Sequence, residues 1–204
     1  MQIKNRTILI IVCTLSLYIF NSNLHAEEFN ISASEISIDK KNNIVTGKGG
    51  VEVTDSEGKL IKSNKVTYEK SKEFLLAEES VEVIDIEGNI FKSDKAAYNK
   101  KKEIIITYEN SEWTLKEGYK LTSNKILYDA IEKVISSDQN SILSDSDGNI
   151  ITVNMFQYNM KKNLFSSAGE IKIVDANKNK FFFKELYVDT KKKEMIGSDV
   201  SVLL

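Results

Sequence analysis

Hydrophobic and polar residues recur along this chain at an interval of 30 residues, beginning at Phe29. The segments Thr67–Asn89 and Ala97–Tyr119 share a tyrosine, a lysine-rich turn, an apolar run and a Glu-Gly pair in the same register. A repeat of this length is typical of arrays in which each unit buries its apolar face against its neighbours. The chain divides into six units, which start at Phe29, Lys59, Asn89, Tyr119, Asn149 and Asn179.

The spacing within each unit predicts β-strands. Apolar residues at positions eight and ten lie two residues apart with polar residues between them, which is the period of a half-buried strand. Position seventeen is apolar and position nineteen is small in the same alternation. The change of parity between positions three and eight predicts a bulge or bend in the first strand of each unit. Each unit is therefore predicted to form two strands of about ten residues.

Two kinds of turn separate these strands. One is lysine-rich, as in Lys100–Lys102, and the other is acidic and ends in glycine, as in Asp85–Gly88. Glycine supplies the positive φ that hairpin turns need, and parallel neighbours would need crossovers instead, so we predict an antiparallel meander curled on itself. A parallel β-solenoid with 30-residue coils remains the alternative. The two kinds of turn are expected on opposite rims of the sheet, one basic and one acidic, unless the turns are simply solvated.

The apolar positions form a continuous stripe through the six units. If the sheet closes completely, this stripe is only a core; if it closes partly, the stripe lines a groove that could hold alkyl chains. Small residues at position nineteen would leave room along one wall. The residues predicted to face the interior and to contact acyl chains are Val66, Tyr68, Phe91, Tyr98, Trp113, Ile126, Tyr128, Phe156 and Tyr158.

Residues 1–26 have the anatomy of a secretory signal peptide. A basic start precedes the apolar run Ile8–Phe20, and a small-residue cleavage site ends at Ala26. The run is shorter than the roughly 20 apolar residues of a membrane-spanning helix, although a retained anchor is the alternative. We therefore expect a signal peptide at 1–26 and one domain at 27–204.

Removing the signal peptide restricts the chemistry of the mature chain. Cys13, His25 and Arg6 are the only residues of their types, and all three would be lost. Disulfides, thiolate or imidazole metal sites and Ser-His or Cys-His pairs are then excluded. The 28 basic residues less Lys4 and Arg6 leave 26 against 30 acidic ones, a net charge of −4, which does not favour nucleic acid as a partner. We expect no enzyme, no cofactor and no metal.

The ends of the array are expected to be open. The composition contains no proline, and the last residues Val202–Leu204 are an apolar strand without a cap. Unpaired strand edges can add a strand from another sheet, head to tail.

The segment Ile31–Gly88 resembles the OstA-like domain of the lipopolysaccharide-transport (Lpt) family. The shared pattern is a small residue, x-x-apolar-x-Tyr-Asp/Asn/Glu, a polar turn, an apolar run, Gly-x-Val-x-apolar and an acidic-Gly turn. It is strongest over Phe29–Gly88 and stays in register to Leu204. The resemblance implies an antiparallel β-jelly-roll in the periplasm of Gram-negative bacteria. Members shelter the acyl chains of lipid A in an apolar groove and join edge to edge. Two kinds of member fit: the soluble bridge protein and the N-terminal domain of the outer-membrane assembly protein.

The expected function is therefore periplasmic lipopolysaccharide transport and outer-membrane assembly. The expected partners are lipopolysaccharide and other Lpt jelly-rolls joined by edge strands, including a second copy of this chain. The alternative is a structural or adhesive secreted β-repeat protein with a packed interior and no lipid ligand. A carbohydrate-active β-helix is disfavoured by the scarcity of clustered acids.

Overall fold

The computed structural model describes residues 29–115 and 118–203, so the predicted signal peptide lies outside the described residues. The described part is all-β, as predicted, with two single-turn 3-10 helices, η1 (Lys70–Lys72) and η2 (Lys100–Lys102). The strands are β1 (Phe29–Ser32), β2 (Glu35–Asp39), β3 (Ile44–Asp55), β4 (Leu60–Glu69), β5 (Phe74–Ile84), β6 (Ile90–Asn99), β7 (Ile104–Thr114), β8 (Lys120–Asp129), β9 (Val134–Ser137), β10 (Ser141–Ser144), β11 (Ile150–Val153), β12 (Phe156–Asn159), β13 (Leu164–Val174), β14 (Lys180–Asp189), β15 (Glu194–Ser198) and β16 (Ser201–Leu203).

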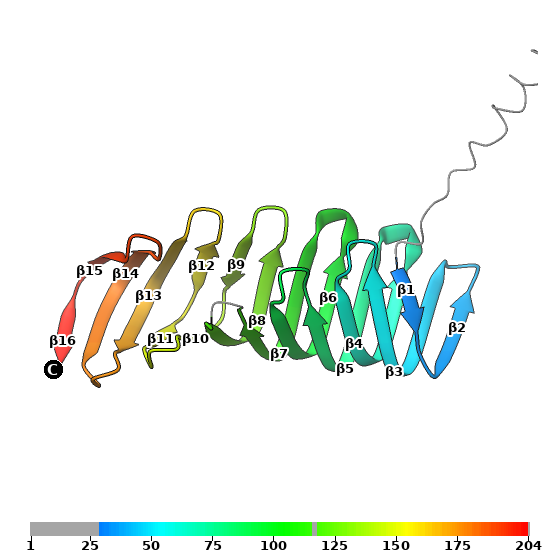
Figure 1. Ribbon diagram of the computed structural model, residues 1–204, viewed down its shortest axis with the longest axis horizontal. Coiled ribbons are helices and arrows are strands. Elements are labelled where there is room, and N and C mark those ends of the chain that lie inside the picture. The colour runs from blue at the N-terminus through cyan, green and yellow to red at the C-terminus, as the bar shows by residue number, and fades with distance from the viewer. Residues whose placement is uncertain (1–28, 116–117, 204) are drawn as a thin grey trace, which may run out of the picture.

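The strands form one sheet in which successive strands pair with each other. Figure 1 shows them following one another along the long axis, from β1 and β2 at one end to β15 and β16 at the other. The central order is β3-β4-β5-β6-β7-β8, and every pairing between described strands is antiparallel. The antiparallel prediction is confirmed, and the parallel solenoid is excluded. None of the described residues forms a helix long and apolar enough to cross a membrane.

The long strands bend at the position where the sequence changes parity. In β4, Ser63 and Val66 are both buried although they lie three residues apart, so inward-facing parity switches between them. The predicted bend is confirmed, but the extra residue of the bulge lies in the neighbouring strand that pairs with β4. Lys48 to Val51 of β3 spans one residue more than Lys65 to Ser63 of β4.

The two residues at the bulge of such a long strand have positive φ. In β3 they are Gly49 and Gly50, with φ of 75° and 55°, and in β5 they are Glu79 and Ser80, with φ of 67° and 58°. Such a bulge kinks a strand and increases its twist. Because the bulges follow one another across neighbouring strands, the whole sheet is folded along one line.

The fold doubles the sheet into two layers that face each other. Phe91, which precedes the bend of β6, has its ring centroid 5.7 Å from that of Tyr128, which follows the bend of β8. Phe29 of β1 meets Tyr68, beyond the bend of β4, edge to face at 4.7 Å. The core lies between the two layers, and the inward-facing residues of both form a single apolar cluster. This arrangement is consistent with the predicted β-jelly-roll.

Doubling the sheet also brings the two kinds of turn together, which corrects the expectation of separate basic and acidic rims. Lys100 Nζ lies 3.1 Å from Glu57 Oε1, and Lys133 Nζ lies 2.6 Å from Glu87 Oε1. The two kinds of turn do lie at opposite ends of the strands, but the bend returns these ends to the same side. Lysines and glutamates that would lie on opposite rims of a flat sheet therefore form ion pairs. We call the line along which the turns of the two layers meet the seam.

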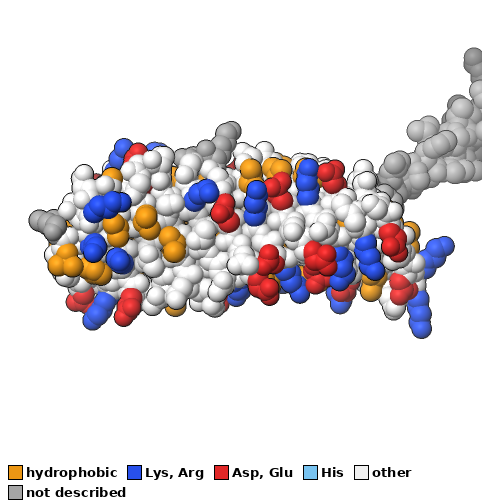
Figure 2. Space-filling model, turned by 90° about the horizontal axis from the view of Figure 1, so that it is seen from below, with side chains coloured by type: hydrophobic (Ala, Val, Ile, Leu, Met, Phe, Trp, Pro, Cys, Tyr) orange, Lys and Arg blue, Asp and Glu red, His pale blue; other side chains and the backbone are white. Residues whose placement is uncertain are grey.

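The two ends of the sheet remain uncovered in the described chain. At one end, Ile36 and Ile38 of β2 are exposed, and at the other, Ile196 of β15 and Leu203 of β16 are exposed. Figure 2 shows hydrophobic side chains gathered toward the β15 and β16 end, whereas Lys and Asp or Glu side chains alternate over the other half. The polarity of this face thus changes along the long axis.

Candidate functional site

The structure places the nine predicted lipid-contacting residues between the two layers. Eight of them are buried, with at most 5% of the side chain and backbone exposed, and Tyr158 is half-buried. The buried eight are Val66, Tyr68, Phe91, Tyr98, Trp113, Ile126, Tyr128 and Phe156. The alternation of apolar and polar residues in the sequence therefore identified the inward-facing positions correctly.

The aromatic members form clusters rather than one continuous row. Phe91 stacks on Trp113 at 4.3 Å between ring centroids, and Tyr128 lies 5.3 Å from Trp113. Farther along the sheet, Phe156 stacks on Phe165 at 5.8 Å. Aromatic pairs at these distances contribute about 0.5–1.5 kcal/mol beyond the burial of their area. In the first half of the sheet, the interior is thus filled by the protein's own side chains.

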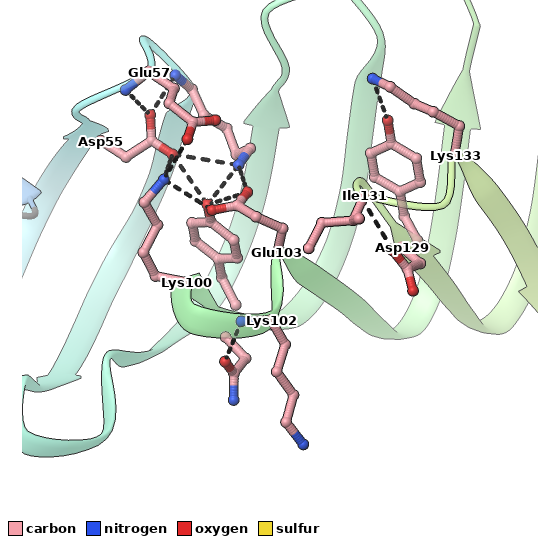
Figure 3. A network of polar contacts seen from close by, with 12 residues as sticks. Asp55, Glu57, Lys100, Lys102, Glu103, Asp129, Ile131 and Lys133 are labelled. Atoms are coloured by element: carbon pink, nitrogen blue, oxygen red, sulfur yellow. Dashed lines mark hydrogen bonds and ion pairs between the residues drawn. The ribbon is translucent and has the colours of Figure 1, made fainter. Parts of the chain in front are cut away.

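A buried polar cluster closes the seam between the layers in this first half (Figure 3). Lys59, which is 4% exposed, donates hydrogen bonds to Asp55, to the hydroxyl of Tyr98 and to Glu103, the last at 2.9 Å. The Tyr98 hydroxyl donates in turn to Glu103 at 2.8 Å. Lys100 adds an ion pair with Glu103 at 2.8 Å. Residues from the β3–β4 turn, the β6–β7 turn and the strands β3 and β6 are therefore tied together at one point of the rim.

Electrostatics keeps this cluster charged. Burial alone would raise the pKa of Asp55 and of Glu103, but hydrogen bonds and the lysine charges outweigh it and lower both. Burial would lower the pKa of Lys100, but hydrogen bonds to Glu103 and Glu57 outweigh it and raise that pKa to about 12. Burial and the neighbouring carboxylates raise the pKa of Tyr98, so the phenol stays neutral. The ion pairs and hydrogen bonds of this cluster therefore hold the two layers together at the rim.

A second contact closes the seam one unit farther along. Lys133 Nζ contacts Glu87 and donates a hydrogen bond to the Tyr128 hydroxyl at 3.3 Å. The right side of Figure 3 shows Lys133 reaching that hydroxyl. Burial raises the pKa of Tyr128, and the Lys133 charge opposes this increase. The polar end of Tyr128 thus lies at the rim while its ring packs in the core.

The acidic turns have a common internal geometry with one exception. In the turn after β5, Asp85 accepts hydrogen bonds from the backbone of Asn89 at 2.9 Å and from its side chain at 2.7 Å. The same pair recurs as Asp145–Asn149 and Asp175–Asn179, and Asp55–Lys59 is a charged version of it. In the turn after β7 the two positions are Leu115 and Tyr119, so the polar pair is replaced by two apolar side chains.

An apolar cavity of about 120 Å³ lies beside this exceptional turn. Three of the predicted residues, Trp113, Phe156 and Tyr158, contribute to its wall. The other walls come from both layers, including Leu115, Leu121 and Tyr119, the last of which is 45% exposed.

The described residues contain no group of three or more His, Cys, Asp or Glu residues that could hold a metal ion. The buried atoms without a hydrogen-bond partner among them are Thr107 Oγ1, Ser111 Oγ and Trp113 Nε1, all on β7. Three isolated neutral donors on one strand do not make a nucleophile and its base. The arrangement can bind an apolar group and exclude water.

Sequence reasoning missed two sets of residues. It named Lys59 only as the first residue of a repeat unit and gave it no role, although the structure buries it among carboxylates. It also passed over Leu115 and Tyr119, although the replacement of an otherwise regular Asp and Asn pair was visible in the repeat. A departure from the repeat, rather than agreement with it, was the signal for this site.

The comparisons with known proteins found matches only among solved structures. No protein-family model matches the chain, and no curated protein does. A similar solved structure is the crystal structure of LptH, the LptA homologous periplasmic component of the conserved lipopolysaccharide transport device from Pseudomonas aeruginosa. The two chains are 12% identical, and the match covers 86% of this chain and 94% of that chain with a TM-score of 0.26. At that TM-score the likeness decides nothing about this chain's function.

Proposed function

We propose that this protein is a periplasmic carrier in lipopolysaccharide transport, which binds lipid A acyl chains between its two layers. The observation that carries the proposal is the apolar cavity between the layers, whose wall contains the predicted residues Trp113, Phe156 and Tyr158. The sequence pattern of the OstA-like domain supports the same class of ligand. The uncovered end strands support joining to other jelly-rolls, or to a second copy, by strand addition.

The proposal requires the layers to separate. The cavity is too small for several acyl chains, and the first half of the interior is already filled. Acyl chains would therefore displace inward-facing side chains as the seam opens. The proposed ligand site is the interior along both layers, including Val66, Tyr68, Phe91, Tyr98, Ile126 and Tyr128.

Photocrosslinking tests this proposal. A photoreactive amino acid at Phe156, whose side chain faces the interior, is expected to capture lipopolysaccharide in cells. The matched control is Lys172 on β13, which is exposed between the buried Ile171 and Ile173. Capture at Lys172 but not at Phe156 would refute a lipid site between the layers.

The alternative is a structural β-repeat protein whose interior is only a core. The stacked aromatic clusters and the ion-paired seam favour it. Native mass spectrometry of the purified chain separates the two functions. Bound lipid supports the carrier, and an empty chain that takes up no added lipopolysaccharide supports the structural protein.

A further inference from the structure

A groove of about 380 Å³ crosses the outer face of the sheet from β8 to β14, beside the bend. Its centre is one row of outward-facing residues that pair across neighbouring strands, namely Leu127, Ser136, Gln157, Ser166 and Tyr187. Leu127 and Tyr187 stand at the two ends of this row, and smaller or polar side chains lie between them. All the residues that line the groove belong to the described part of the chain.

The repeat explains why the face is hollow at this place. In two earlier units the position of Ser136 is occupied by Leu76 and Ile106, which fill the same row. Serine stands there in the next two units, as Ser136 and Ser166, and the row becomes bulky again at Ile196. The groove is therefore the part of the row in which large side chains are replaced by small ones.

A second row, along the bend, changes at the same place. Its lysines pair with acids on the neighbouring strand, as Lys125 does with Asp138 at 3.1 Å. Thirty residues farther on, these two positions are Met155 and Ala168, and all four residues line the groove. One end of the groove is therefore charged, whereas the part beside Met155 is apolar.

The groove combines exposed apolar side chains with hydrogen-bonding groups that have no partner. Met155 and Tyr187 are 50% and 49% exposed. Among the described residues, the hydroxyls of Ser136 and Tyr187 and the side-chain amide of Gln157 make no hydrogen bond. An alkyl or aromatic ligand would remove water from these groups without replacing its hydrogen bonds, which costs free energy. A pyranose ring matches both features, because it has an apolar C–H face and hydroxyls around its edge.

The size of the groove and its single acid fit binding rather than cleavage of a sugar. A volume of about 380 Å³ is near the lower end of the range for small-molecule sites, about 300–1,000 Å³. Asp138 carries the only carboxylate among the residues that line the groove. Glycoside hydrolysis generally uses two carboxyl groups, one on each side of the bond that is cleaved.

We propose that this groove binds one pyranose ring of a glycan, stacked on Tyr187 with its hydroxyls on Ser136 and Gln157. The oligosaccharide of lipopolysaccharide and the glycan strands of peptidoglycan both present such rings. The site lies on the outer face of the sheet and is separate from the acyl chains proposed to lie between the layers. This inference therefore goes beyond the proposed function and does not depend on it.

Saturation-transfer NMR of the purified full chain tests the ligand class. The probes are the lipid-free core oligosaccharide of lipopolysaccharide and the peptidoglycan disaccharide of N-acetylglucosamine and N-acetylmuramic acid. At least one is expected to bind saturably with a Kd on the order of 1 mM, and the tighter one identifies the source. The absence of saturable binding by both, or tighter binding of p-cresol as a mimic of an aromatic side chain, would overturn the proposal.

Two variants test the location of the site. Ser136→Ile reproduces Ile106 of the same row, so it is expected to fold, to fill the groove and to weaken glycan binding tenfold or more. Tyr187→Ala removes the stacking surface and is expected to weaken binding about as much. The controls are Thr46→Ile, at the equivalent position of β3, and Tyr119→Ala, which alters a 45% exposed tyrosine outside the groove. Circular dichroism checks that all four variants are folded, and unchanged binding in Ser136→Ile and Tyr187→Ala would overturn the site.

Ser136→Ile also separates this inference from the proposed function, because Phe156 lines both the groove and the cavity between the layers. Capture of lipopolysaccharide at Phe156 that persists in Ser136→Ile supports the acyl-chain site, whether or not lipid-free glycans bind. Capture that is lost in Ser136→Ile, while lipid-free glycans bind the unmutated chain, supports the groove and counts against a lipid site between the layers.

Discussion

At the scale of single residues, the cluster around Lys59 is the most consequential departure from a simple β-repeat. A lysine that is 4% exposed is tolerated because Asp55 and Glu103 pair with it. Buried ion pairs contribute little net stability when intact, but removing one partner leaves an uncompensated buried charge. The cluster therefore makes the closed first half sensitive to single substitutions.

We predict that Lys59→Met destabilises the protein by about 3 kcal/mol or more, because Asp55 would keep a buried carboxylate with one fewer cation. Urea unfolding followed by circular dichroism measures this. The control, Lys62→Met, breaks an exposed pair with Glu52 and is expected to cost less than about 1 kcal/mol. Equal losses in the two variants would show that the cluster is no more than a surface contact.

A second prediction concerns alkaline pH. The pKa of Lys100 rises from 10.5 to about 12 on folding, so the folded state holds this proton more tightly. The resulting stability is fully present below pH 10.5 and is lost as the pH rises towards 12, about 2 kcal/mol in all. The raised pKa of Tyr98 acts in the same direction.

Urea unfolding between pH 9 and 12 is the measurement. The stability difference between the unmutated chain and Lys100→Met should shrink by about 2 kcal/mol over this range. The difference from Lys191→Met, a substitution in an exposed turn, should stay constant. A Lys100 difference that is independent of pH would contradict the assigned proton linkage.

At the scale of elements, the bend in the strands folds the antiparallel meander into two layers. The long strands β3, β5, β7 and β13 all carry positive φ at this point, but with different residues. β3 uses glycine, whereas β5 uses Glu79 and Ser80, which pay a steric cost that glycine avoids.

Ser80→Gly is therefore expected to stabilise the protein by about 0.5–1 kcal/mol, because relief of left-handed strain exceeds the added chain entropy. Ser80 is exposed, so no packing is lost. Ser37→Gly, on the exposed strand β2, serves as the control and should destabilise by about 0.5–1 kcal/mol. Thermal unfolding of both variants gives the comparison, and destabilisation by Ser80→Gly would mean that the serine backbone is unstrained there.

At the scale of the whole molecule, the uncovered ends favour joining of copies. β2 pairs only with β3, and β15 pairs only with β14. Each end strand therefore carries an unpaired edge and exposed apolar side chains.

Charges at both ends should block this joining. Ile38→Lys with Ile196→Lys is expected to weaken self-association of the chain roughly tenfold or more. The control, Ile131→Lys, alters a 57% exposed isoleucine in a turn away from both end strands. Sedimentation at several concentrations measures the association, and a chain that is monomeric throughout would refute head-to-tail joining of copies.

The sequence by itself determined the β-strands, the place at which they bend and the inward-facing side chains from Val66 to Tyr158, whereas the pairings in the structure decided for antiparallel strands against a parallel solenoid. These features follow from the period of two in the apolar residues and from the repeat of 30 residues. Both are local patterns that do not depend on the overall shape of the molecule. Only the tertiary structure decided which turns meet. Glu57 and Lys100 are 43 residues apart, and Glu87 and Lys133 are 46 apart.

Contacts between residues so far apart in sequence depend on the bend and twist accumulated over several strands, which no local pattern encodes. For the same reason, only the folded sheet revealed that Lys59 is buried and that Leu115 lines an apolar cavity.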